Sequence, residues 1–160
     1  MDIFLHFIHL TAAMIWVGGQ IFLGLILGPV LRRSMTPKER MPLALAVAKR
    51  FQRVSHAALG LLILTGLWQV RFLFLSSLSS FLDTSYGRIF WAKMVLFVVM
   101  LILGVLHDKR WGPALALHAD RPDSPEFRGA ARRMAFWARL NIGVTLGVVL
   151  CASALRHLTF

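Results

Sequence analysis

The stretch that decides the fold runs from Leu5 to Gln20 and reads LHFIHLTAAMIWVGGQ. It places two histidines inside an apolar segment. At about 100° per residue, one stripe of a helix built from it contains His6, His9, Ala13, Trp16 and Gln20. An imidazole inside hydrocarbon is unfavourable unless it faces protein, so we expect this stripe to face the interior of a membrane protein.

The rest of the chain has the composition of a membrane protein. Its 160 residues are 58% hydrophobic and only 16% charged, and the apolar residues come in four long runs. Each run can cross roughly 30 Å of hydrocarbon as a helix. The sequence therefore predicts an all-α fold, a four-helix transmembrane bundle forming one integral membrane domain over residues 1–160. The expected helices cover about 3–31, 42–75, 88–110 and 125–158. The first run has neither the basic flank nor the cleavage site of a signal peptide, so we expect it to be retained.

The basic residues predict the orientation. Seven of the 18 Lys and Arg lie between Arg32 and Arg53, and seven more lie between Lys109 and Arg139. The positive-inside rule places both of these connections in the cytoplasm and both termini outside. The net charge of +11 is split between two connections, which disfavours nucleic acid as a partner and favours anionic lipid of the bilayer.

Both basic connections contain a helix-start signal. Thr36-Pro37-Lys38-Glu39 has the pattern of a capping box, and Asp123-Ser124-Pro125-Glu126 is a second signal of this kind. The second and fourth helices are therefore expected to begin in the cytoplasm, which hints at two related hairpins. Pairs of glycines four residues apart would let helices approach closely, and a homodimer is one use of them.

Every predicted helix carries a histidine. The topology assigns His6, His9 and His157 to the outer half of the membrane and His56 and His107 to the inner half. Neutral imidazoles from facing helices are the usual axial ligands of haem in a helical bundle. We expect an inner pair, His56 with His107, and an outer pair, His157 with His9 or His6, holding one or two haem groups. An isolated histidine near a helix end also serves simply as an interfacial residue, and this alternative stays open for His6 and His157.

The cofactor follows from the ligand types. No Cys-x-x-Cys-His motif is present, so the haem would be non-covalent haem b. Lys93 and Arg88 would pair with haem propionates or with an anionic substrate, the alternatives being a snorkelling lysine and an interfacial arginine. Copper is the alternative metal, with His6, His9, Met14 and Met100 as transient ligands, although these residues do not form a dense Met or Cys cluster.

Short motifs resemble known families. His9 with Trp16-Val17-Gly18-Gly19, and Tyr86-Gly87-Arg88 with Lys93, are similar to the first and third helices of the bacterial copper-resistance protein D family. The His-to-Trp spacing and the lysine also resemble the membrane-bound J-type protoporphyrinogen oxidases, which are haem b proteins. The resemblance implies an inner-membrane protein that handles copper or porphyrin, with His9, Arg88 and Lys93 as its functional positions. His56 and His107 depart from the copper-resistance pattern and favour a haem-binding variant over a copper importer. We also expect this protein to lack the further helices or the periplasmic copper-binding domain that often accompany the pattern, which disfavours copper import.

Three functions therefore compete. The preferred one is a haem b redox protein that transfers electrons from or to a quinone or another small redox substrate. The second is protoporphyrinogen oxidation, with a porphyrin substrate docked by Arg88 and Lys93. The third is copper uptake or copper tolerance. The sequence assigns no catalytic residue.

Overall fold

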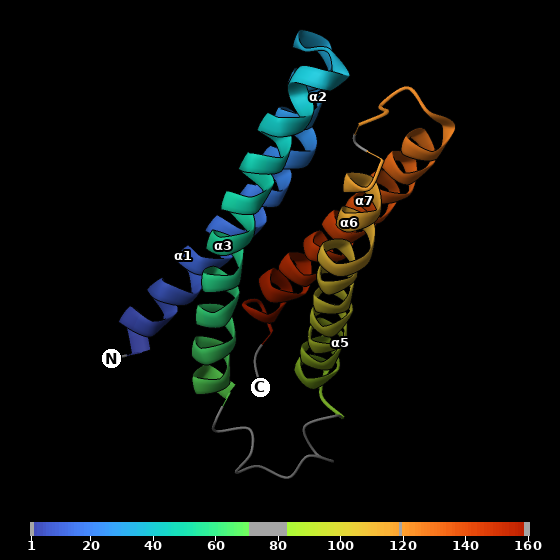
Figure 1. The fold of residues 1–160 in the computed structure, drawn as a ribbon. Helices are drawn as coiled ribbons and strands as arrows, with labels where there is room; N and C mark the ends of the chain where they lie inside the picture. Colours follow the sequence, from blue (N-terminus) through green and yellow to red (C-terminus); the bar gives the residue numbers. More distant parts are fainter. Residues whose placement is uncertain (1, 71–82, 119, 159–160) are drawn as a thin grey trace. The chain divides into compact units, whose positions relative to one another are not determined.

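The structure, a computed structural model, describes residues 2–70, 83–118 and 120–158, and within them it is all-α (Figure 1). It divides into two compact units, residues 1–78 and 79–160, each built around a pair of antiparallel helices. We call these pairs hairpin 1 and hairpin 2. The end of the predicted second helix, 71–75, and most of the loop after it lie outside the described residues.

Hairpin 1 consists of α1 (Asp2–Ile21), a π-helical turn η1 (Phe22–Leu27), the short α2 (Gly28–Ser34) and the long α3 (Pro37–Val70). Hairpin 2 repeats this order with α5 (Ser85–Leu106), the π-helical turn η3 (His107–Trp111), α6 (Gly112–Ala116) and α7 (Pro125–Leu155). The four predicted helices are thus confirmed, with α1, η1 and α2 together forming the first. Their grouping into one domain stays a prediction.

Three of these helical segments are long and apolar enough to cross a membrane. They are Ile3–Ser34, Ser85–Ala116 and Pro125–Leu155, with mean hydropathies of 1.9, 2.6 and 1.7. Within the described residues α3 does not qualify, because its first part is basic and its apolar part, interrupted by His56 and Gln69, is followed only as far as Val70. Many large apolar side chains are exposed, Ile3, Leu64 and Leu150 among them, as expected for a surface in contact with acyl chains.

The first helix of each hairpin is longer than a bilayer is thick. At 1.5 Å per residue, 32 residues extend about 48 Å, against roughly 30 Å of hydrocarbon. In each hairpin, the part of the first helix that exceeds the bilayer thickness lies beside the basic first half of the second helix, which is α3 in hairpin 1 and α7 in hairpin 2. In hairpin 1, Gly19 packs against Phe51 of α3, and in hairpin 2, Trp111 stacks on Trp137 of α7. Both hairpins are thus extended at the end where the second helix is basic, and the placement of that end in the cytoplasm stays a prediction.

A π-helical turn interrupts both first helices at the same kind of sequence, just before Gly-Pro. The Gly28 N–H donates to the Leu23 carbonyl and the Gly112 N–H donates to the His107 carbonyl, each five residues back. Proline has no N–H, and its ring collides with the carbonyl four residues back, so an inserted residue relieves the conflict. The hint of two related hairpins is therefore strengthened by a feature that the sequence analysis did not use.

The predicted helix starts are also present. The Thr36 N–H and hydroxyl both donate to Glu39 Oε2, at 3.0 and 2.7 Å. In hairpin 2, the Phe127 N–H donates to the Ser124 hydroxyl at 3.1 Å. These caps satisfy backbone or hydroxyl donors at the starts of α3 and α7, so both helices begin where local chemistry places them.

Candidate functional site

The predicted inward stripe of α1 contacts α3 at His9 and buries Trp16, but its first residue, His6, is exposed. Trp16 is buried in hairpin 1, and His9 Nδ1 lies 2.7 Å from the hydroxyl of Thr65 on α3. His6, one turn earlier, is exposed, with its Nδ1 3.5 Å from Gln69 Oε1. That distance is at the limit of a hydrogen bond, so the contact of His9 is the stronger of the two.

His9 sits in the most polar part of the helix contact in hairpin 1. Thr65 is only 5% exposed, and its hydroxyl also donates to the Leu61 carbonyl at 2.6 Å. A methyl group added at Gly66 would lie 3.5 Å from His9 Cε1, so the ring lies against the backbone of α3. Thr65 and Gly66 were missed by the sequence analysis. They lie more than fifty residues from His9 in an apolar run, and no local spacing connects them to it.

The other predicted histidines lie in different surroundings. His56 is exposed on α3, and His157, just beyond the end of α7, is exposed as well. His107 is half-buried as the first residue of η3, and its carbonyl accepts the hydrogen bond from Gly112. Each predicted ligand pair joins one histidine from each hairpin, so both pairings stay predictions.

The two predicted cationic residues lie on the first three turns of α5. Arg88 is exposed, and its guanidinium donates to the Asp83 carbonyl at 3.1 Å and to the Ser85 hydroxyl at 3.2 Å. Lys93 is half-buried. Its Nζ lies 5.3 Å from the centre of the Phe90 ring, within the range of a cation–π contact. Arg88 thus has local partners at the helix start, whereas Lys93 lies beside the buried ring of Phe90.

Lys93 and His9 hold matching positions in the two hairpins. Each lies 19 residues before the glycine of the Gly-Pro pair, since 28 − 9 and 112 − 93 are both 19. The first helix of each hairpin therefore has an ionisable side chain at the equivalent position, 19 residues before the glycine of its Gly-Pro pair.

The copper ligands suggested by the sequence are not gathered around His9. Met14 is 66% exposed and, five residues after His9, lies about 140° around α1 from it. Met100 belongs to hairpin 2, where it is 1% exposed and part of the core. Within residues 2–70, 83–118 and 120–158, no three His, Cys, Asp or Glu side chains are grouped so that they could hold one metal ion.

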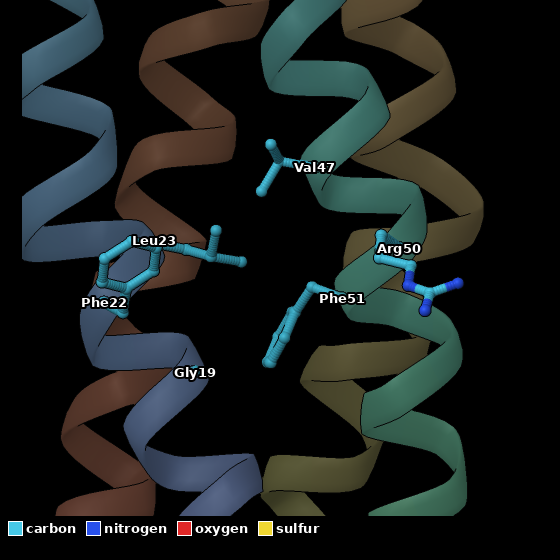
Figure 2. Close-up of a pocket in the computed structure, with 6 residues that line it drawn as sticks. All are labelled: Gly19, Phe22, Leu23, Val47, Arg50 and Phe51. Carbon is cyan, nitrogen blue, oxygen red and sulfur yellow. The ribbon is translucent and has the colours of Figure 1, made fainter.

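A pocket of about 260 Å³ lies within hairpin 1, between the start of η1 and α3. Its lining consists of Gly19, Phe22, Leu23, Val47, Arg50 and Phe51. Figure 2 shows Leu23 and Phe51 directed into the space between the two helices, with the Arg50 guanidinium directed away from it. The pocket contains none of the predicted ligands, and its apolar walls offer no chemical group to a metal.

Comparison with known proteins identifies the family. The model of the copper resistance protein D family matches residues 45–155, more than two thirds of the chain. The chain belongs to this family. The matched range includes His56, Arg88, Lys93 and His107, whereas His9 and His157 lie outside it. The predicted resemblance to the copper-resistance family is thereby confirmed.

Two relatives extend the comparison. A protein of Bacillus subtilis (strain 168) named copper transport protein CutJ is 37% identical over 107 residues, which are 67% of this chain and 19% of that protein. This chain therefore spans about a fifth of that relative. An uncharacterized protein of Aquifex aeolicus (strain VF5) is 31% identical over 116 residues, which are 72% of this chain and 73% of that protein. No solved structure matches. Family and helices together make this chain an integral membrane protein of the copper resistance protein D family.

Proposed function

We propose that this protein binds copper within the inner membrane as part of copper uptake or copper tolerance. The observation that carries the proposal is the family match over residues 45–155, and the relative named as a copper transport protein supports it. The family match favours copper over haem as the metal.

His9 is the ligand that the structure supports best. It is half-buried, its Nδ1 lies 2.7 Å from the Thr65 hydroxyl, and its ring lies against the α3 backbone at Gly66. Imidazole nitrogen is a good ligand for copper. Because the described residues offer no closed group of ligands, we expect copper to be held transiently by few ligands, as suits a transported ion rather than a structural one.

The test is copper binding and copper accumulation. Purified protein in detergent should bind copper(I) under anaerobic conditions, and cells expressing it should show a changed copper content by elemental analysis. His9→Gln should lose most of both effects. His118→Gln is the matched control, because His118 lies in the second cytoplasmic connection and is not a predicted ligand. Equal copper binding by wild type and His9→Gln would contradict the role of His9.

A haem b redox protein is the second candidate. The single, widely spaced histidines favour it, because haem iron needs only one axial histidine nitrogen on each face of the porphyrin. His9 with His157 and His56 with His107 would be the axial ligands, and Arg88 and Lys93 would pair with propionates or with a porphyrin substrate. Haem would supply one-electron chemistry with a quinone or another small oxidant.

A visible spectrum separates the two candidates. A Soret band that is lost in His107→Ala, with a pyridine test for haem type and count, would favour haem. A colourless, iron-free preparation that binds copper would remove the haem hypothesis. If haem is found, rescue of a strain that lacks its own protoporphyrinogen oxidase would distinguish that enzyme from an electron carrier.

A further inference from the structure

The pocket in hairpin 1 has walls of hydrocarbon. Leu23 and Phe51 are directed into it, and Phe22, Val47 and the aliphatic stem of Arg50 contribute to its lining (Figure 2). In proteins, an apolar cavity of about 150 Å³ stays dry and binds a molecule the size of benzene. At about 260 Å³, this pocket has room for a segment of an alkyl chain, and its walls favour such a segment over water or an ion.

A glycine distinguishes hairpin 1 from hairpin 2 at this pocket. Gly19 belongs to the lining, and the Phe51 ring lies directly against it. The equivalent position in hairpin 2 is Leu103, since 112 − 28 and 103 − 19 are both 84. The side chain of Leu103 is only 7% exposed, so hairpin 2 buries a leucine where hairpin 1 has no side chain.

The pocket lies at the level where acyl chains meet lipid headgroups. A hydrocarbon layer of roughly 30 Å that begins at Ile3 ends about 20 residues later, near Leu23 of η1, because a helix rises about 1.5 Å per residue. On α3, Arg53 is the last basic residue before the apolar run that starts at Val54. The two helices therefore place the same boundary beside the pocket.

Positive charge gathers at this end of hairpin 1 with few carboxylates to balance it. Seven Lys and Arg lie between Arg32 and Arg53, whereas residues 1–70 contain two acidic residues, Asp2 and Glu39. Asp2 begins α1 at the opposite end of the hairpin, and Glu39 Oε2 accepts two hydrogen bonds from Thr36. Arg50 is exposed, with its guanidinium directed away from the pocket (Figure 2). Such a side chain can contact an acyl chain with its stem and a phosphate with its charged end.

We propose that this pocket binds an anionic phospholipid, which inserts one acyl chain between η1 and α3 and pairs its phosphate with Arg50. Basic pockets between membrane helices bind anionic lipid headgroups. The apolar walls select a hydrocarbon chain, and the surrounding charge selects an anionic lipid over a zwitterionic one. The proposal does not depend on copper or haem, because none of the predicted metal ligands lines the pocket.

The first experiment maps where the lipid lies. The full chain is placed in phosphatidylethanolamine vesicles that contain a little phosphatidylglycerol with a photoactivatable diazirine in one acyl chain. After irradiation, peptide mass spectrometry should find the label concentrated on residues 19–23 and 47–51. Val47→Trp, which fills the pocket, should remove most of this labelling. Leu45→Trp is the matched control, because Leu45 is exposed on α3 outside the pocket, and it should leave the labelling unchanged.

The second experiment measures lipid selectivity. Native mass spectrometry of the purified chain in detergent compares phosphatidylglycerol with phosphatidylethanolamine of the same acyl chains, and wild type should bind phosphatidylglycerol more tightly. Arg50→Gln should weaken phosphatidylglycerol binding about fivefold, which corresponds to about 1 kcal/mol for one basic residue near anionic lipid, and should leave phosphatidylethanolamine binding unchanged. Lys49→Gln is the matched control, because Lys49 is an exposed neighbour that does not line the pocket.

Three results would overturn the proposal. Labelling spread evenly along α1 and α3 would indicate ordinary contact with bilayer lipid only. Unlabelled pocket residues in wild type would show that another part of the protein or a second copy fills the pocket. Equal losses in Arg50→Gln and Lys49→Gln would show attraction by overall charge rather than a site at Arg50. Both of these residues are exposed, so the second experiment decides even if Val47→Trp does not fold.

Discussion

Gly19 of α1 lies against the Phe51 ring of α3, and replacing it tests the register of hairpin 1. A Cβ at this position would overlap the ring of Phe51, whereas a Cβ at the neighbouring Gly18 would meet no atom within 4 Å. Figure 2 shows the Phe51 ring directed towards Gly19 between the two helices. The two glycines are adjacent in sequence, so they provide a matched pair with the same local propensity.

The magnitudes follow from two opposing terms. Glycine to alanine inside a helix favours the folded state by about 0.5 to 1 kcal/mol through backbone entropy. Overpacking costs about 1 to 3 kcal/mol, and here the Phe51 ring would have to turn away from Gly19. Gly18→Ala should therefore be stabilising. Gly19→Ala should be destabilising, with a net loss of up to about 2 kcal/mol.

The assay is unfolding in mixed detergent micelles, followed by circular dichroism, for wild type, Gly18→Ala, Gly19→Ala, Phe51→Ala and the Gly19/Phe51 double variant. Residues in contact typically couple by about 0.5 to 3 kcal/mol, and the alanine at position 51 should remove the penalty at Gly19. If Gly19→Ala stabilises as much as Gly18→Ala, or if the double variant shows no coupling, the helix register described here is wrong.

Three other predictions concern local contacts. Two hydrogen bonds from Thr36, the larger effect coming from its side chain and the smaller from its backbone, lower the pKa of Glu39. The stabilisation from this cap should therefore be fully present above the ordinary carboxyl pKa and should be lost as the pH falls through the lowered pKa. NMR titration of the Glu39 carboxyl measures this pKa, and Glu39→Gln is the uncharged control. The rings of Trp111 and Trp137 are stacked, with their centres 4.8 Å apart and their planes at 7° to each other. A double-mutant cycle that replaces each tryptophan by leucine should give a coupling energy of about 0.5 to 1.5 kcal/mol. A coupling energy of zero would contradict the stacking. Pro29→Ala restores a backbone N–H, so we expect the π-helical turn η1 before it to become regular α-helix. Hydrogen exchange should then show new protection of the amide at position 29. An unchanged π-helical turn would show that Pro29 does not cause it.

The sequence by itself determined the elements. Local properties of a sequence decide where helices begin and end. In this chain they are the apolar runs long enough to cross a bilayer, the charges gathered in two connections, and the helix starts at Thr36-Pro37 and Ser124-Pro125. The inward face of α1 was also readable, because an imidazole in an apolar helix must face protein. The family resemblance rested on short motifs of this local kind.

The tertiary structure alone decided the partners of those side chains. Thr65 meets His9 only because α3 runs antiparallel to α1 in one particular register. In the same register Phe51 lies against Gly19, and no spacing along the chain reveals either contact. The sequence analysis missed the π-helical turns, because the spacing of hydrophobic residues does not show whether a backbone N–H bonds to the carbonyl four or five residues back. Packing between distant segments fixes such choices, since side chains and backbone groups must fit one another in space.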